Sequence, residues 1–176
     1  MKYFKITELI RCYRESKAGR CEECRLNEAA KRLPNGIEEN ITELAQAVLD
    51  PAREALGKAV VVNSGFRCPI HNSHVGGASQ SQHIKGQAAD ICVDHKGYAS
   101  MREWREANLE LARVIARQGK WDQMILENVG RNDLLPAWVH VSYNRFGQNR
   151  HEVRKKVAGQ SGYPLLSKDE MNELLK

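Results

Sequence analysis

The sequence has no long hydrophobic run and no leader-like start. The longest uninterrupted apolar run, Ala59–Val62, is four residues, whereas a membrane-spanning helix needs about 20. Lys2, Lys5, Glu8 and Arg11 place charges throughout the first residues, which is not the pattern of a secretory signal peptide. We therefore expect no membrane insertion, and synthesis in the cytoplasm without a signal peptide.

Cysteine is scarce and odd in number. Five cysteines, at 12, 21, 24, 68 and 92, cannot all pair within one chain, so we expect reduced thiols. Cys21 and Cys24 form a C-x-x-C that would clamp zinc if Cys12 and a histidine joined it, but no second C-x-x-C or H-x-x-x-H follows. The charged residues around the motif favour a solvated turn.

Positive charge is in modest excess and is concentrated in one stretch. The chain carries 27 Lys and Arg against 22 Asp and Glu, a net +5, and residues 145–156 alone contribute +4. Such a stretch suits nucleic acid, an anionic cell wall, a membrane surface or simply a solvated face. Because it lacks interleaved aromatic residues beyond Phe146 and any known recognition element, we expect no nucleic-acid partner.

The length of 176 residues predicts one domain that buries about 70% of its surface without a structural metal. Apolar periodicity predicts helices over much of residues 1–58, with N-caps at Thr7 and Asn40, at 101–118 and near the C-terminus. Short apolar runs predict strands at 60–63, 88–93, 121–127 and 138–143, the last two forming a hairpin. We expect an α+β fold, with helices packed on one side of a small, mainly antiparallel sheet.

Alternation along the predicted strands gathers polar residues on one face. Val139 and Val141 suit the core, which turns Trp138, His140 and Ser142 the other way. The same rule puts Gln123, Ile125 and Glu127 on one face of the preceding strand, and Asp90 opposite the apolar Ala89, Ile91 and Val93.

Two histidines and an aspartate suit a zinc site on that face. His83 precedes Asp90 by seven residues, so the two converge only if Gly86 turns the chain between them. With His140 they make a three-ligand set with water in the fourth position, and a nearby glutamate can serve as general base. The alternative at this point is that His83 is a loop residue and His140 an ordinary surface histidine.

The same residues resemble a known family, the zinc peptidases of bacterial cell walls that include D-Ala-D-Ala carboxypeptidases and L-Ala-D-Glu endopeptidases and share the hedgehog-type fold. The resemblance runs through an S-x-H-x-x-G-x-A-x-D core at residues 81–90. It extends to the S-G-F-R-C-P segment at 64–69, to Asp122-Gln123 and to W-V-H-V-S at 138–142. The whole of residues 1–146 is similar to a domain common in phage and prophage proteins.

The resemblance implies that His83, Asp90 and His140 bind one Zn²⁺ in a cleft on the open side of the sheet. Relatives often carry the basic carboxylate three residues before the last histidine, where this chain has Ala137. We therefore expect Glu127 to be the general base, with Asp133 in reserve.

Further roles follow from the same resemblance. Arg67 matches an arginine that binds substrate or the developing oxyanion, a task suited to a planar guanidinium. We expect Ser81, Gln123, Trp138 and Ser142 to bind substrate or to support the site.

The sequence therefore predicts a zinc metallopeptidase domain at residues 1–146, followed at 147–176 by a basic extension with a short terminal helix. The expected substrate is a peptidoglycan stem peptide, hydrolysed by a monomer that reaches the wall only if released or delivered, as an endolysin-like phage protein would be. The alternative is a non-catalytic zinc domain that binds wall fragments or a protein partner, an alternative that Ala137 keeps open.

Overall fold

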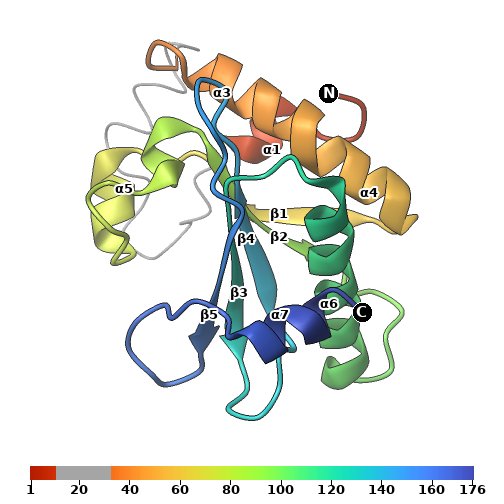
Figure 1. The fold of residues 1–176 in the computed structure, drawn as a ribbon. Helices are drawn as coiled ribbons and strands as arrows, with labels where there is room; N and C mark the ends of the chain where they lie inside the picture. Colours follow the sequence, from red (N-terminus) through yellow and green to blue (C-terminus); the bar gives the residue numbers. More distant parts are fainter. Residues whose placement is uncertain (11–32) are drawn as a thin grey trace.

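The computed structural model describes residues 1–10 and 33–176, so the predictions for Cys12, Cys21 and Cys24 lie outside the described residues. Five strands form one sheet in the order β1-β2-β4-β3-β5 (Figure 1). The strands are β1 (Val60–Ser64), β2 (Ala88–Val93), β3 (Gln123–Val129), β4 (Trp138–Ser142) and β5 (Glu152–Val157). All neighbouring pairs are antiparallel except β3 and β5, which run parallel. The predicted α+β class with a mainly antiparallel sheet is confirmed.

Helices precede, connect and follow the strands. They are α1 (Ile6–Leu9), α3 (Ile37–Leu44), a π-helical turn (Ala45–Leu49), α4 (Asp50–Leu56), α5 (Pro69–His74), a 3-10 turn (Gln82–Lys85), α6 (Met101–Gln118) and α7 (Lys168–Leu174). Ser100 caps α6 by accepting from the backbone N–H of Glu103, and Ser167 caps α7 in the same way through Glu170.

Two predicted N-caps are wrong. The N-cap of α1 is Lys5, which leaves Thr7 inside the helix. Helix α3 begins after Gly36, whose φ of 80° is in the left-handed region that glycine tolerates. Asn40 therefore lies within the helix, where its side chain donates to the backbone carbonyl of Lys85 at 2.8 Å and accepts from Arg145 Nε at 2.8 Å.

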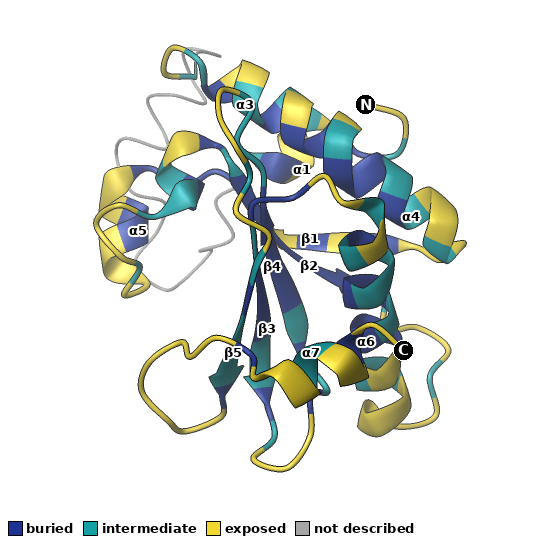
Figure 2. Cartoon of the chain, in the orientation of Figure 1, coloured by how far each residue is buried: buried dark blue, intermediate teal, exposed yellow. Residues whose placement is uncertain are grey.

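The core lies between one face of the sheet and the helices α1, α3, α4 and α6. Every second residue of β3 and β4 faces this core, and these residues are fully buried: Met124 and Leu126 on β3, Val139 and Val141 on β4. They form one apolar cluster with Leu111 and Ile115 on the inner face of α6. Figure 2 shows the buried centre of the sheet and the exposed loops around it. The opposite face is left for polar residues, as the alternation predicts.

Strand β5 lies in residues 147–176, where the sequence analysis predicted no strand. Its segment, EVRKKV, is mostly charged, and only Val153 and Val157 turn into the core. Charged residues are common on edge strands because they discourage pairing with other chains, so the apolar signal of this strand is weak. The sheet therefore continues past residue 146, and α7 packs against α6 through Arg113, whose guanidinium donates to the carbonyl of Leu174 at 3.1 Å.

Among the helices of the described residues, none has both the length and the apolar content needed to cross a membrane.

Candidate active site

The polar face of the sheet brings three predicted ligands together. Asp90 on β2 and His140 on β4 are direct cross-strand partners, so their side chains emerge side by side. His83 comes from the 3-10 turn that precedes β2, and Gly86 ends that turn with a φ of 66°. The turn at Gly86 thus brings His83 and Asp90 to the same face, although their odd spacing would place them on opposite faces of a continuous strand.

The ligand atoms of these residues converge on one point. Nε2 of His83 lies 3.2 Å from Oδ1 of Asp90 and 3.1 Å from Nδ1 of His140, and Nδ1 of His140 lies 2.9 Å from the same Oδ1. Zinc bonds of about 2.0–2.2 Å in a tetrahedral site separate neighbouring ligand atoms by about 3.4 Å. The residues His83, Asp90 and His140 are only 2%, 8% and 7% exposed. Two imidazoles and a carboxylate at these separations fit a zinc ion.

His83 is held from two sides. Its Nδ1 lies 2.7 Å from the backbone carbonyl of Gly65, which can only accept, so Nδ1 donates to it and Nε2 is the nitrogen that faces Asp90 and His140. Ser81 caps the 3-10 turn, where its hydroxyl accepts from the backbone N–H of His83 at 3.3 Å. Ser81 thus contacts the backbone of His83, and its predicted role in supporting the site stays a prediction.

Gly65 is a close-packed position. A Cβ at residue 65 would lie 2.0 Å from the carbonyl oxygen of Leu9, and the neighbouring Phe66 N–H donates to that same oxygen at 2.6 Å. The absence of a side chain thus lets the backbone that orients His83 pack directly on α1.

Arg67 lies beside the ligand carboxylate. Its Nη2 pairs with Oδ2 of Asp90, and its Nε donates to the hydroxyl of Ser64 at 2.8 Å. Burial alone would raise the pKa of Asp90, but the neighbouring His83 and His140 hold it well below its usual range. The carboxylate is therefore ionised, as a metal ligand must be.

Glu127 lines the same cleft as the three ligands. Burial raises its pKa from 4.5 to about 7, and the negative charge of Asp90 adds to that rise, while the charges of His140, Lys156 and Arg67 oppose it. A carboxylate with a pKa near neutrality is suited to take up and release a proton at neutral pH.

The two other positions considered for the base differ from Glu127. The carboxylate of Asp133 accepts from the backbone N–H groups of Gly130 at 3.1 Å and Leu135 at 3.0 Å, so it shapes the β3–β4 connection, and it is not among the residues that line the cleft. Ala137 is buried, and its N–H donates to the carbonyl of Glu127 at 2.9 Å. Within the described residues, the geometry thus favours Glu127 over Asp133.

The cleft has a volume of about 860 Å³. Ser81, Gln123 and Trp138, predicted to bind substrate or to support the site, are among its lining residues. Ser142 is not, because its side chain is buried between strands: its hydroxyl accepts from the backbone N–H of Gln123 at 3.0 Å and donates to the carbonyl of the same residue at 3.3 Å.

Part of the cleft wall was missed from the sequence. Arg150, Arg154 and Tyr163, all beyond residue 146, line the cleft, and Arg154 Nη1 donates to the carbonyl of Tyr163 at 2.6 Å. His71 of α5, which the sequence analysis did not place in the site, is 8% exposed and also lines the cleft. The signal for the missed wall was the period-two spacing of charged residues at 150, 152, 154 and 156, which places them on one face of a strand.

The sequence is similar to those of known peptidases. The family described as Peptidase M15 matches residues 2–142. A zinc D-Ala-D-Ala carboxypeptidase from Streptomyces albus G is 43% identical over 56 residues, which are 31% of this chain and 22% of that protein. The matched part of the chain thus spans about a fifth of that relative, and the expected phage origin stays a prediction. Because the family match covers most of the sequence, the chain belongs to the peptidase M15 family of zinc metallopeptidases.

Proposed function

We propose that this chain hydrolyses a peptide bond in the stem peptides of peptidoglycan, as a D-Ala-D-Ala carboxypeptidase or an L-Ala-D-Glu endopeptidase. The observation that carries the proposal is the convergence of His83, Asp90 and His140, with ligand atoms within 3.2 Å of one another in a cleft that Glu127 also lines. The Streptomyces relative, named for its action on D-Ala-D-Ala, supports the substrate class.

Each residue of the site has a distinct task in this proposal. His83, Asp90 and His140 hold the zinc ion, which when bound supplies a water of lowered pKa and a Lewis acid for the scissile carbonyl. Glu127 takes up the proton of the attacking water and delivers it to the leaving amine. Arg67 contacts the substrate oxygen on which negative charge develops, and its bond to Ser64 fixes the guanidinium.

The cleft wall binds the rest of the peptide. Trp138 and Gln123 lie on the same side as Glu127, since Glu127 and Trp138 are cross-strand partners and Gln123 is four residues before Glu127 on β3. Residues two or four apart on a strand share a face, so these side chains are placed to contact the peptide next to the scissile bond.

Digestion of purified peptidoglycan, followed by mass spectrometry of the products, tests the proposal. Loss of one terminal alanine identifies a carboxypeptidase, and new free amines inside the stem identify an endopeptidase. The matched controls are the chelated protein and Glu127→Gln, and the variant should release product at least about 100-fold more slowly than wild type. A zinc-loaded wild-type protein that cleaves no wall peptide would contradict the proposal and favour a non-catalytic zinc domain.

We also propose that the protein acts as a monomer at the cell wall once it is released or delivered there. Its formal net charge of +5 favours association with an anionic polymer. Light scattering coupled to gel filtration measures the mass, and a dimer mass would contradict the monomer.

A further inference from the structure

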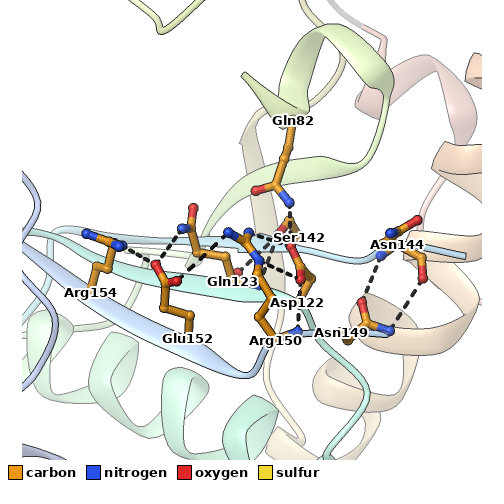
Figure 3. A network of polar contacts seen from close by, with 9 residues as sticks. All are labelled: Gln82, Asp122, Gln123, Ser142, Asn144, Asn149, Arg150, Glu152 and Arg154. Carbon is orange, nitrogen blue, oxygen red and sulfur yellow. Dashed lines mark hydrogen bonds and ion pairs between the residues drawn. The ribbon is translucent and has the colours of Figure 1, made fainter. Parts of the chain in front are cut away.

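A polar network joins the metal-binding side of the sheet to the C-terminal segment (Figure 3). At its centre is Asp122, which directly precedes β3 and is only 4% exposed. Arg150 Nη2 donates to Oδ2 of Asp122 at 2.6 Å, and Arg150 Nε and its backbone N–H both donate to Oδ1 at 2.9 Å. On the other side, Gln82 Nε2 donates to Oδ2 at 2.6 Å.

The backbone of Asp122 is fixed as firmly as its side chain. Its N–H donates to the carbonyl of Ser142 on β4 at 2.7 Å, and its carbonyl accepts from Glu152 on β5 at 3.1 Å. Burial would raise the pKa of Asp122, but the hydrogen bonds from Arg150 and Gln82 hold it below its usual value. Asp122 is thus an ionised, buried group locked at the junction of three strands.

The network ends next to a metal ligand. Gln82 is the first residue of the 3-10 turn, His83 is the second, and the backbone carbonyl of Gln82 accepts from Gln87 at 3.0 Å. The ring of His83 is anchored by Gly65, whereas the start of the turn that carries it is anchored to the sheet by Asp122. His83, which is not on a strand, is thus anchored both through its ring and through the turn that carries it.

We propose that Asp122 is a positioning residue that, together with Arg150, holds Gln82 and so fixes His83 for zinc binding. The inference rests on the proposed ligand set. It extends the metal centre beyond residue 142, where the family match ends, because Arg150 supplies the cation. An alternative use of Arg150, as a binding group for a substrate carboxylate, is disfavoured because Nε and Nη2 already contact Asp122. Only Nη1, which lies 3.9 Å from Oε2 of Glu152, is left for a substrate.

Zinc affinity, measured by competition with a chromogenic chelator, tests the inference without any need for activity. Gln82→Ala, Arg150→Gln and Asp122→Asn are each expected to weaken zinc binding about 10-fold or more, the usual loss when outer-shell partners of a metal ligand are removed. Arg150→Lys should restore part of the affinity. Because all three residues act through one path, Gln82→Ala combined with Arg150→Gln should bind zinc no more weakly than the weaker single variant.

The matched control is Arg154→Gln, which removes a cleft-lining arginine that pairs with Glu152 and should leave zinc affinity unchanged. If Asp122→Asn fails to fold, Gln82→Ala still tests the inference, because Gln82 is only half-buried and its replacement leaves the Asp122–Arg150 pair intact. The inference is overturned if folded Gln82→Ala and Arg150→Gln bind zinc within threefold of wild type. The inference is also overturned if zinc binding in wild type does not depend on His83, and the proposed ligand set then fails as well. Failure of peptidoglycan cleavage alone would contradict the proposed function but not this inference.

Discussion

Replacing Glu127 with Gln is expected to have opposite effects on activity and on stability. Gln keeps the shape and polarity of the side chain but can neither take up nor release a proton. Loss of a positioned general base typically costs about 10² to 10⁴ in rate, which is about 3 to 5 kcal/mol of transition-state stabilisation. The variant should therefore lose at least about 100-fold in peptidoglycan cleavage while it retains zinc.

The stability effect follows from the pKa of Glu127 in the zinc-free protein, which burial raises from 4.5 to about 7. Because the folded value lies above the unfolded one, the unfolded chain loses its proton first, and stability falls as the pH rises from about 4.5 to about 7. The difference corresponds to about 3 kcal/mol, reduced to about 2 kcal/mol by partial exposure of the carboxylate. Gln resembles the protonated acid and avoids this loss.

Urea unfolding of the zinc-free proteins measures the difference. Glu127→Gln should be more stable than wild type by about 2 kcal/mol near pH 8, and the two should be equally stable near pH 4. Asp133→Asn is the matched control for activity, because its carboxylate is bonded to the β3–β4 connection, and it should cleave at close to the wild-type rate. Activity of Glu127→Gln within threefold of wild type, or an equal stability near pH 8, would refute the reasoning.

Three further predictions concern the surroundings of the site. Chelation of the metal should leave the far-ultraviolet circular dichroism spectrum unchanged, because the apolar cluster packs on the opposite face of the sheet; loss of the helix signal would mean that zinc is structural. Gly65→Ala should lower the free energy of unfolding by about 1–3 kcal/mol, because its Cβ would lie 2.0 Å from the carbonyl oxygen of Leu9. Calorimetry should show a lower unfolding temperature, and an unchanged temperature would contradict the close packing. Arg67→Lys keeps the positive charge but loses the planar set of guanidinium donors, so kcat/KM should fall about 100-fold while zinc is retained. An unchanged kcat/KM would show that Arg67 does not contact the substrate.

The shared face of Asp90 and His140 was predictable because strand alternation has a fixed period of two. Both residues sit between apolar neighbours, so their facing is determined as soon as the strands are recognised. His83 required one more feature, the glycine at residue 86, whose left-handed conformation ends the 3-10 turn. These parts of the site depend on local geometry, which the sequence encodes directly.

The wall formed by β5 was not predictable in the same way. Its parallel pairing with β3 joins segments about 30 residues apart, and the apolar signal of a strand whose exposed face is charged is weak. The period-two spacing of its charged residues indicates a strand but not the strand with which it pairs. The preference for Glu127 over Asp133 came from strand alternation, which places Glu127 on the face of His140, whereas the side-chain contacts of Asp133 could not be read from the sequence. The hydrogen bonds that Asp133 accepts from the backbone N–H groups of Gly130 and Leu135 support this preference.

The central claim is that His83, Asp90 and His140 hold one zinc ion, and elemental analysis of protein purified without added metal tests it most directly. Wild type should contain about one equivalent of zinc, and His140→Ala should contain less than about 0.3 equivalent while its circular dichroism spectrum stays that of a folded protein. Zinc below about 0.3 equivalent in wild type, or an undiminished zinc content in His140→Ala, would contradict the claim.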